Sequence, residues 1–286
     1  RAFGPELIVS IFSENIPALP HLLFMRSALV KSACLGKAAR GEPTFAPLYL
    51  KTIEEIDPEM AECMAVLYWQ GGEEEIEASL FEQADAVVLF GGVETCRSLL
   101  EKIPRRIKTL VHGHRLGFGV IGRQRMKRQG MERLAEAVAL DCSMFDQQAC
   151  LAPHVYYLEE GGEISPKEFC QAVAVAMETL NQRMPRGRIS PGEASAIHQL
   201  RAAYEFRELN GEEVLVLASS FGTDRTVVYE KDPGAFSPSP LNRFIRIYGV
   251  EDIFQVPPTL KPISPFLQNA AVAIGDEREK EFIRIL

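Results

Sequence analysis

The first half of the chain alternates between strand and helix patterns, and this alternation is the strongest constraint on its fold. Short apolar segments are separated by helical patterns of about ten residues, which is typical of a parallel sheet covered by helices on both faces. The expected strands are 7–12, 34–39, 64–69, 85–90 and 107–111, and the expected helices are 21–30, 45–56, 74–84 and 94–103. Ligands of such a sheet bind beyond the carboxyl ends of its strands.

The second half also mixes helices and strands, after a division that we place near residue 122. Apolar residues spaced three and four apart between Met131 and Phe145 predict a helix, and the apolar run 155–158 predicts a strand. Ser-Pro pairs at 165–166 and 190–191 predict the starts of two more helices. These helices are expected at 167–182 and 193–207, and further strands at 214–218, 225–229 and 243–248.

Composition limits the classes of protein to consider. The 286 residues are 47% hydrophobic and 24% charged, which is ordinary for a soluble globular protein. A net charge of −8 argues against nucleic-acid binding. No apolar stretch reaches the roughly 20 residues of a membrane helix, and no signal-peptide pattern opens the chain. Six cysteines without zinc spacing indicate reduced thiols, so we expect a cytoplasmic protein with no metal site.

One basic run interrupts this acidic composition. Arg123-Gln124-Arg125-Met126-Lys127-Arg128 has two interpretations. Such runs are commonly solvated loops, and the alternative is a contact surface for the phosphates of a nucleotide or of coenzyme A.

Cys150 is the most informative single residue. It lies between the expected helix and the strand 155–158, in the run Asp146-Gln147-Gln148-Ala149-Cys150-Leu151-Ala152-Pro153. A cysteine thiolate is a strong nucleophile, and a loop between two rigid elements would hold it at one angle to a substrate. The alternative is a small buried apolar residue, which is a common role of unpaired cysteines. The flanking polar residues and proline favour the nucleophile.

Other candidate residues follow expected strands of the first half. Gly91 and Gly92 come after the strand 85–90 and open a helix, where a phosphate could bind, although a plain turn is an equal alternative. Lys37 and Arg40 lie at the presumed carboxyl end of the second strand, where a ribose or phosphate could be met. Ordinary surface charge is the alternative for both.

Two histidines follow the strand 107–111. His112 and His114 flank Gly113, and a histidine near a cysteine can activate it. If the strand continues, the two side chains point to opposite faces, so we expect only one to face the site.

Together these residues resemble the long-chain acyl-CoA reductase family of luminous bacteria, within the aldehyde dehydrogenase superfamily. The matching segments are Asp146-Gln147-Gln148-Ala149-Cys150-Leu151-Ala152-Pro153 and Gly113-His114-Arg115-Leu116-Gly117-Phe118-Gly119-Val120, supported by Glu14-Asn15-Ile16-Pro17 and Lys31-Ser32-Ala33-Cys34-Leu35-Gly36-Lys37. The resemblance implies an aldehyde-dehydrogenase-like α/β fold with two domains, each a largely parallel sheet flanked by helices. It assigns 1–122 to NADP(H) binding and 123–286 to the catalytic cysteine. We expect the first domain to lack an N-terminal part and the second a C-terminal part.

The resemblance also implies roles for single residues. Cys150 matches the cysteine that accepts the acyl group, and Asn15 matches the asparagine whose amide stabilises the oxyanion, a contribution of roughly 3 kcal/mol. His114 resembles the family's Gly-His-[Lys/Arg] histidine, and His112 stays a possible substitute. Lys37 matches a lysine that contacts the adenosine ribose. Gly91 and Gly92 match the pyrophosphate turn, where Val93 replaces a hydroxyl residue.

Two departures from the superfamily pattern predict the chemistry. Arg40 replaces the glutamate with which NAD-preferring members bind the ribose, and an arginine attracts a 2′-phosphate, so we predict NADPH. Val111 replaces the glutamate that activates water in hydrolytic members. Without that base, a thioester on Cys150 should persist until a hydride or another thiol attacks it.

The resemblance therefore implies NADPH-dependent reduction of a long-chain acyl-CoA, or of another acyl-carrier thioester, to the aldehyde. Its implied partners are that thioester, an acyl-supplying enzyme and further copies of the chain in a homo-oligomer. The alternatives are a CoA-acylating aldehyde dehydrogenase, an acyl-phosphate reductase, or a nucleotide-binding remnant without catalysis.

Overall fold

The computed structural model describes residues 4–231 and 234–286, and the chain divides into two compact units between His114 and Arg115. This boundary lies eight residues before the division that we expected near residue 122. The segment 116–121 forms a strand of the second unit's sheet. Among the described residues, every helix is too short or too polar to span a bilayer.

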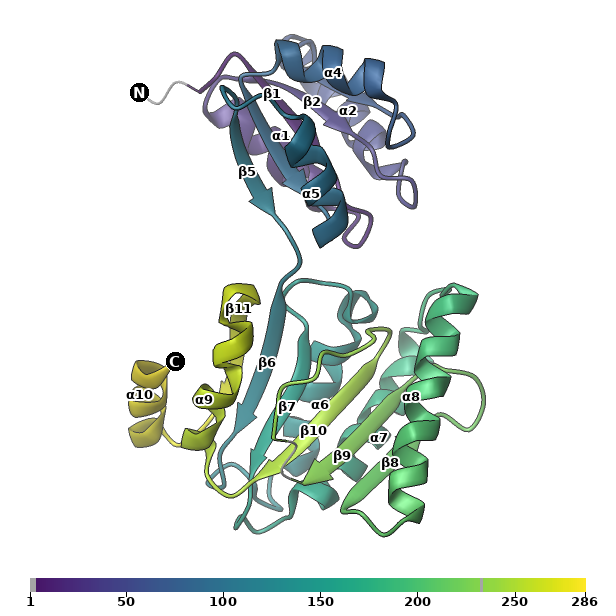
Figure 1. Ribbon diagram of the computed structural model, residues 1–286, viewed down its shortest axis with the longest axis vertical. Helices are drawn as coiled ribbons and strands as arrows, with labels where there is room; N and C mark the ends of the chain where they lie inside the picture. The colour runs from purple at the N-terminus through teal and green to yellow at the C-terminus, as the bar shows by residue number, and fades with distance from the viewer. Residues whose placement is uncertain (1–3, 232–233) are drawn as a thin grey trace. The chain divides into compact units, whose positions relative to one another are not determined.

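The first unit is a five-stranded sheet in the order β3-β2-β1-β4-β5, and every neighbouring pair is parallel (Figure 1). Its strands are β1 (Leu7–Ile11), β2 (Ala33–Lys37), β3 (Met64–Leu67), β4 (Ala86–Phe90) and β5 (Lys108–His112). Its helices are α1 (Leu19–Leu29), α2 (Phe45–Ile56), α3 (Pro58–Ala61), α4 (Glu74–Gln83) and α5 (Val93–Lys102). The predicted elements of the first half are all present, within two residues at most of their ends.

Alternate residues of these strands face two separate cores. Val9 and Leu89 belong to a cluster with Phe81 of α4 and Leu99 of α5. On the opposite face, Cys34 and Val88 pack with Phe24 of α1 and Ala46 of α2. Burial on both faces explains why the strands are near-continuous apolar runs, as is usual for parallel sheets.

The second unit is a six-stranded sheet in the order β11-β6-β7-β10-β9-β8. Four neighbouring pairs are parallel, and β8 runs antiparallel to β9 at one edge. Its strands are β6 (Leu116–Ile121), β7 (Pro153–Glu159), β8 (Val214–Ala218), β9 (Thr226–Lys231), β10 (Phe244–Val250) and β11 (Leu267–Ala273). Its helices are α6 (Met131–Ser143), α7 (Pro166–Arg183), α8 (Pro191–Leu209), α9 (Val256–Leu260) and α10 (Asp276–Ile285), with 3₁₀ turns at Met144–Gln147, Ile253–Gln255 and Lys261–Phe266.

Helices cover both faces of this sheet as well. Tyr156 and Ile247 pack with residues of α6 and α7, including Val138 and Phe169. The other face is covered by α9 and α10 over β6 and β7, and by α8 over the β8–β10 end. Two units, each with a largely parallel sheet between helices, confirm the predicted fold class.

Two strands of the second unit were missed, and their residues explain why. β6 contains Gly117 and Gly119, and glycine is rare in strands. A side chain at Gly119 would overlap the ring of Tyr156, since a Cβ there would lie 2.1 Å from it. β11 contains Gln268, Asn269 and several alanines, which carry little strand signal.

Candidate active site

The carboxyl edge of the first sheet contains the predicted nucleotide-binding residues. The connections from β1 to β2 and onward to β3 proceed toward one edge, and the chain then returns to place β4 on the other side of β1. Such a reversal leaves a crevice outside the carboxyl ends of the two central strands, which is where ligands of these sheets bind. Asn15 follows β1 at this point, and Gly91 and Gly92 follow β4.

The Gly91–Gly92 turn leaves the start of α5 open. Gly92 is the N-cap residue of α5 and forms no side-chain cap, and an added Cβ there would meet nothing within 4 Å. The first N–H groups of a helix attract anions such as phosphate when nothing covers them. Val93, the first residue of α5, is 49% exposed and adds no hydroxyl donor. The turn can therefore contact a phosphate through backbone groups.

Lys37 ends β2 and lies against the chain's one tryptophan. Its Nζ is 5.1 Å from the centre of the Trp69 ring, and Trp69 is 4% exposed. Burial lowers the pKa of Lys37, and the nearby carboxylates of Glu77 and Glu73 partly oppose that effect. The lysine is thus held close to the sheet edge, where a ribose hydroxyl could accept a bond from it.

Arg40 is exposed in the loop that follows β2. The next residue, Gly41, donates its N–H to the Glu14 carboxylate at 2.8 Å. Glu14 and the half-buried Asn15 belong to the loop after β1. One carboxylate therefore joins the loop of the predicted oxyanion residue to the loop of the predicted phosphate residue.

The two histidines differ in position. The ring of His112, the last residue of β5, stacks on Phe90 with centroids 4.4 Å apart and planes 13° apart. His114 is exposed in the segment between β5 and β6, at the end of the first unit. Cys150 belongs to the second unit, so the activating role of either histidine stays a prediction.

Cys150 lies in the loop between α6 and β7, at the amino edge of the second sheet. It is half-buried, and Gln268 of β11 donates a hydrogen bond from Nε2 to its Sγ at 3.5 Å. Cys34, Cys96, Cys142 and Cys170 are buried instead, and burial raises the pKa of their thiols. The structure therefore contradicts the fully buried alternative for Cys150.

The Cys150 loop lies close against β6. A Cβ on Gly117 would be 3.0 Å from the Ala152 carbonyl oxygen and 3.2 Å from that of Leu151. Asn269 of β11 donates from Nδ2 to the Leu151 oxygen at 2.9 Å. The loop is thus held on one side by two strands, and a side chain at position 117 would crowd it.

The backbone before Cys150 has a rare conformation. Phe145, Asp146 and Gln147 have φ of 50°, 51° and 66°, in the left-handed region that costs L-residues roughly 1–2 kcal/mol each. Surrounding contacts must hold such a turn. The buried Gln147 side chain donates to the Pro153 oxygen at 2.8 Å and accepts from the Phe244 N–H at 3.1 Å. These bonds fix the turn to the first residues of β7 and β10.

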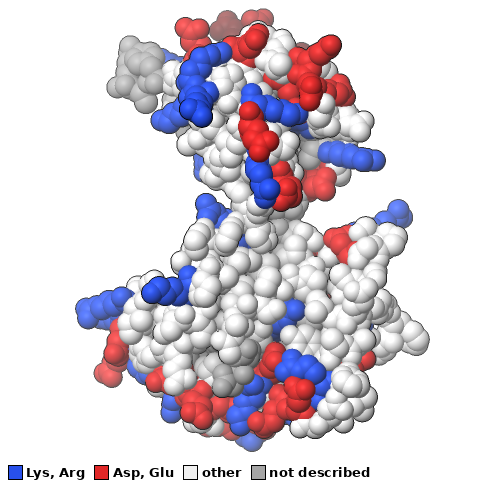
Figure 2. All heavy atoms as spheres, in the orientation of Figure 1, with Lys and Arg blue, Asp and Glu red and all other residues white. Residues whose placement is uncertain are grey.

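The basic run 123–128 is engaged inside the second unit. Arg123 pairs with the buried Glu159 at 2.9 Å, Arg125 with Asp276 at 3.3 Å, and Arg128 with Glu168 at 3.8 Å. In the view of Figure 2, basic and acidic side chains are interspersed in both units. These ion pairs give no support to a phosphate-binding surface in the run.

The structure thus brings Asn15, Lys37, Arg40, Gly91 and Gly92 to one edge of the first sheet and places Cys150 in the second unit. Three residues that contact the segment around Cys150 were missed from the sequence. These are Gln147, Gln268 and also Arg243, which forms an ion pair with Asp146 at 2.7 Å. Gln147 stood inside the matching segment, and that position was its one available signal. Arg243 and Gln268 lie far from Cys150 in the sequence, and no sequence signal connects them with it.

Solved structures define the class of fold. A putative aldehyde dehydrogenase PutA from Anabaena variabilis superposes with a TM-score of 0.70 at 15% identity, covering 99% of this chain and 61% of that one. An NAD-dependent benzaldehyde dehydrogenase from Corynebacterium glutamicum gives a TM-score of 0.70 at 14% identity, covering 99% and 62%. The chain therefore has an aldehyde-dehydrogenase-like fold.

Sequence comparison is more specific. Residues 1–286 match the model of the family described as acyl-CoA reductase (LuxC), and the chain belongs to that family. The long-chain acyl-protein thioester reductase of Photorhabdus luminescens is 24% identical over 285 residues, covering 96% of this chain and 56% of the relative. That of Aliivibrio fischeri is 24% identical over 259 residues, covering 87% and 50%. The chain spans about half the length of the curated relatives it matches.

Proposed function

We propose that the chain takes part in the NADPH-dependent reduction of a long-chain acyl thioester to the aldehyde, with Cys150 as the acyl acceptor. The observation that carries the proposal is the half-buried Cys150 thiol on a loop that neighbouring strands hold in one conformation. Membership in the acyl-CoA reductase family and the names of the relatives, long-chain acyl-protein thioester reductases, support the same chemistry.

The proposed reaction begins at the sulfur. The Cys150 thiolate attacks the acyl carbonyl, a new C–S bond forms, and the bond to the carrier sulfur breaks, which releases the carrier thiol. Asn15 would donate its side-chain amide to the oxyanion. Val111, which is 37% exposed, offers no base to activate water, so hydrolysis of the acyl-cysteine would be slow.

The first unit would hold the nicotinamide cofactor, which supplies the hydride when bound. The uncovered start of α5 fits the pyrophosphate, because its backbone N–H groups meet no side-chain cap. Lys37 would contact the ribose, and the exposed Arg40 would pair with a 2′-phosphate. Val93 would contribute apolar contact only. These residues fit NADP(H), and the Arg40 guanidinium is the reason for preferring it to NAD(H).

The proposed acyl donor is a thioester of coenzyme A or of a carrier protein. The names of the relatives favour a protein-bound acyl group, which would come from an acyl-supplying enzyme as partner. Comparing acyl transfer from the two donors at equal acyl chain length distinguishes them.

The direct test is incubation of the protein with long-chain acyl-CoA, and separately with an acyl-carrier thioester, without NADPH. Peptide mass spectrometry should find the acyl mass on Cys150, and later addition of NADPH should remove it and yield aldehyde. Cys63→Ser is the matched control, because Cys63 is the other accessible thiol. Absence of acyl mass from Cys150 with both donors would contradict the proposal, as would acylation of Cys63 alone.

A further inference from the structure

A second left-handed turn lies against the turn that precedes Cys150. Leu241, Asn242 and Arg243 have φ of 65°, 58° and 64°. The Asn242 N–H donates to the Asp146 carbonyl oxygen at 3.0 Å, and Asn242 Oδ1 accepts from Gln148 Nε2 at 3.0 Å. Since both turns have unfavourable backbone conformations, each depends on the other for its shape.

An ion pair between Arg243 and Asp146 joins the two turns. Arg243 Nε and Nη2 both lie 2.7 Å from Asp146 Oδ1, and the Arg243 side chain is 2% exposed. The remaining amino group, Nη1, donates to Asn181 Oδ1 and to the Met184 carbonyl oxygen, both at 3.0 Å. The guanidinium is therefore bonded on all sides and has one available orientation.

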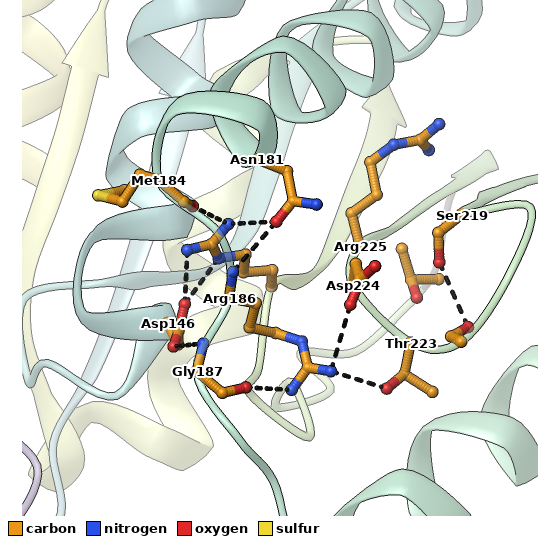
Figure 3. A network of polar contacts seen from close by, with 12 residues as sticks. Asp146, Asn181, Met184, Arg186, Gly187, Ser219, Thr223, Asp224 and Arg225 are labelled. Carbon is orange, nitrogen blue, oxygen red and sulfur yellow. Dashed lines mark hydrogen bonds and ion pairs between the residues drawn. The ribbon is translucent and has the colours of Figure 1, made fainter.

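The second oxygen of the carboxylate ties in a third segment. Asp146 Oδ2 accepts from the Gly187 N–H at 2.8 Å, in the connection between α7 and α8. The neighbouring Arg186 donates to Thr223 Oγ1 at 3.2 Å and pairs with Asp224 at 3.5 Å, both in the connection between β8 and β9 (Figure 3). Asp146 thus ties the cysteine loop to the connection between α7 and α8, which Arg186 in turn ties to the connection between β8 and β9.

We propose that Asp146 and Arg243 are positioning residues for Cys150. Asp146 precedes the cysteine by four residues, so the ion pair acts on the sulfur through the backbone of 147–150 and does not touch the reacting atoms. Loss of the pair would let the left-handed turn relax toward ordinary helix geometry and move the sulfur. A shift of about 1 Å at a reacting group can slow a reaction roughly 100-fold. The inference rests on the proposed function of Cys150.

The variants that test it are Asp146→Asn and Arg243→Lys, with Asp146→Glu as the conservative change that keeps the carboxylate. The chain offers a matched pair of controls, Glu159→Gln and Arg278→Lys. Glu159 is fully buried and pairs with Arg278 at 2.6 Å, but it ends β7, about 20 Å from Pro153 at the start of that strand at ~3.3 Å per residue, whereas Cys150 precedes the start. The controls thus break a buried ion pair in the same unit without altering the cysteine loop.

The first measurement is the rate at which Cys150 becomes acylated in a single turnover. We expect Asp146→Asn and Arg243→Lys to slow it about 100-fold with little change in KM, and Asp146→Glu to regain part of the rate. Glu159→Gln and Arg278→Lys should keep the wild-type rate even where they lower stability. If the control variants lost as much of the acylation rate as the Asp146 and Arg243 variants, the inference would be overturned, because a general loss of stability would then explain both results.

The second measurement does not depend on the proposed reaction. Amide hydrogen exchange of 147–152 should rise in Asp146→Asn or Arg243→Lys and stay unchanged in the controls. If the wild-type protein takes no acyl group, the proposed function fails, while this exchange pattern still decides whether the ion pair fixes the loop. Should Asp146→Asn not fold, Arg243→Lys carries both measurements. Unchanged exchange in a folded variant would overturn the inference.

Discussion

Glu159, the last residue of β7, forms a bidentate ion pair with Arg278 of α10, 119 residues further along the chain, at 2.6 and 2.7 Å. Arg123, in the segment after β6, donates two more bonds to the same carboxylate, one from its backbone N–H and one from its side chain, both at 2.9 Å. This cluster occupies the carboxyl edge of the second sheet, the edge at which parallel sheets ordinarily bind ligands. Cys150 lies at the opposite, amino edge. The two units therefore present candidate residues at opposite edges of their sheets.

The Glu159 cluster predicts a dependence of stability on pH. Burial alone would raise the pKa of Glu159, but the bonds from Arg278 and Arg123 outweigh it and lower the pKa to about 2. Because the folded pKa lies below the ordinary value, the stabilisation is complete above pH ~5 and is lost as the pH falls toward ~2. We expect the second unit to lose about 2 kcal/mol of unfolding free energy over this range, allowing for the partly exposed arginines. Urea unfolding at a series of pH values measures it, and Glu159→Gln should flatten the dependence.

Gly117 offers a test of how closely the cysteine loop approaches β6. A Cβ at this position would lie 2.9 Å from Asn269 Oδ1 and about as close to two backbone oxygens of the loop. We expect Gly117→Ala to cost about 1–3 kcal/mol of stability and to slow acylation of Cys150, since the backbone cannot easily yield. Gly71→Ala is the control, because nothing lies within 4 Å of its Cβ position. Equal thermal stability of the two variants would show that the loop adapts.

Arg40→Glu tests the predicted cofactor preference. Replacing the guanidinium with a carboxylate removes charge-assisted bonds of about 1.5–3 kcal/mol, so NADPH affinity should fall roughly 10- to 100-fold relative to NADH. The one tryptophan, Trp69, lies beside Lys37 and gives a fluorescence signal for titration without turnover. The control is Arg105→Glu, an exposed arginine before β5 at the other end of the sheet. An unchanged preference in Arg40→Glu would contradict the assignment of Arg40.

Thiol accessibility gives a further prediction. In the native protein, a short pulse of N-ethylmaleimide should label Cys63 and Cys150, which are exposed and half-buried. The buried cysteines should stay unlabelled until the chain unfolds, since burial also raises their pKa and reduces the reactive thiolate. Peptide mass spectrometry after the pulse decides the matter. Native-state labelling of Cys142 or Cys170 would show that the second unit opens locally.

The fold was predictable because its strands and helices carry local signals. The first sheet's strands are apolar runs bounded by helical patterns, and both capping boxes, at Ser165 and Ser190, stand where Ser-Pro pairs predicted helix starts. β6 and β11 were missed for the opposite reason. Their glycines, alanines and amides have weak strand preference, and they are strands because their neighbours in the sheet pair with them.

The residues of the candidate site also fall into those that the sequence reveals and those that only the fold brings together. Lys37, Arg40 and the Gly91–Gly92 turn could be named from the sequence, because they lie at the carboxyl ends of predicted strands and such positions gather at one sheet edge. Asn15 was named through the resemblance to the reductase family. Cys150 was found through the segment around it. The groups that hold it could not be found this way, because Gln268 and Arg243 meet the loop only through the folded sheet.

By itself, the sequence determined the alternation of elements, hence parallel sheets, and the residue types available for acyl and phosphate chemistry. Only the tertiary structure decided that 116–121 belongs to the second unit, that the basic run is engaged in ion pairs, and that Asp146 meets Arg243. The physical reason is the separation along the chain over which each kind of interaction acts. Hydrophobic period and capping act between residues a few positions apart, whereas ion pairs and close backbone contacts depend on segments that the chain brings together from a hundred residues away.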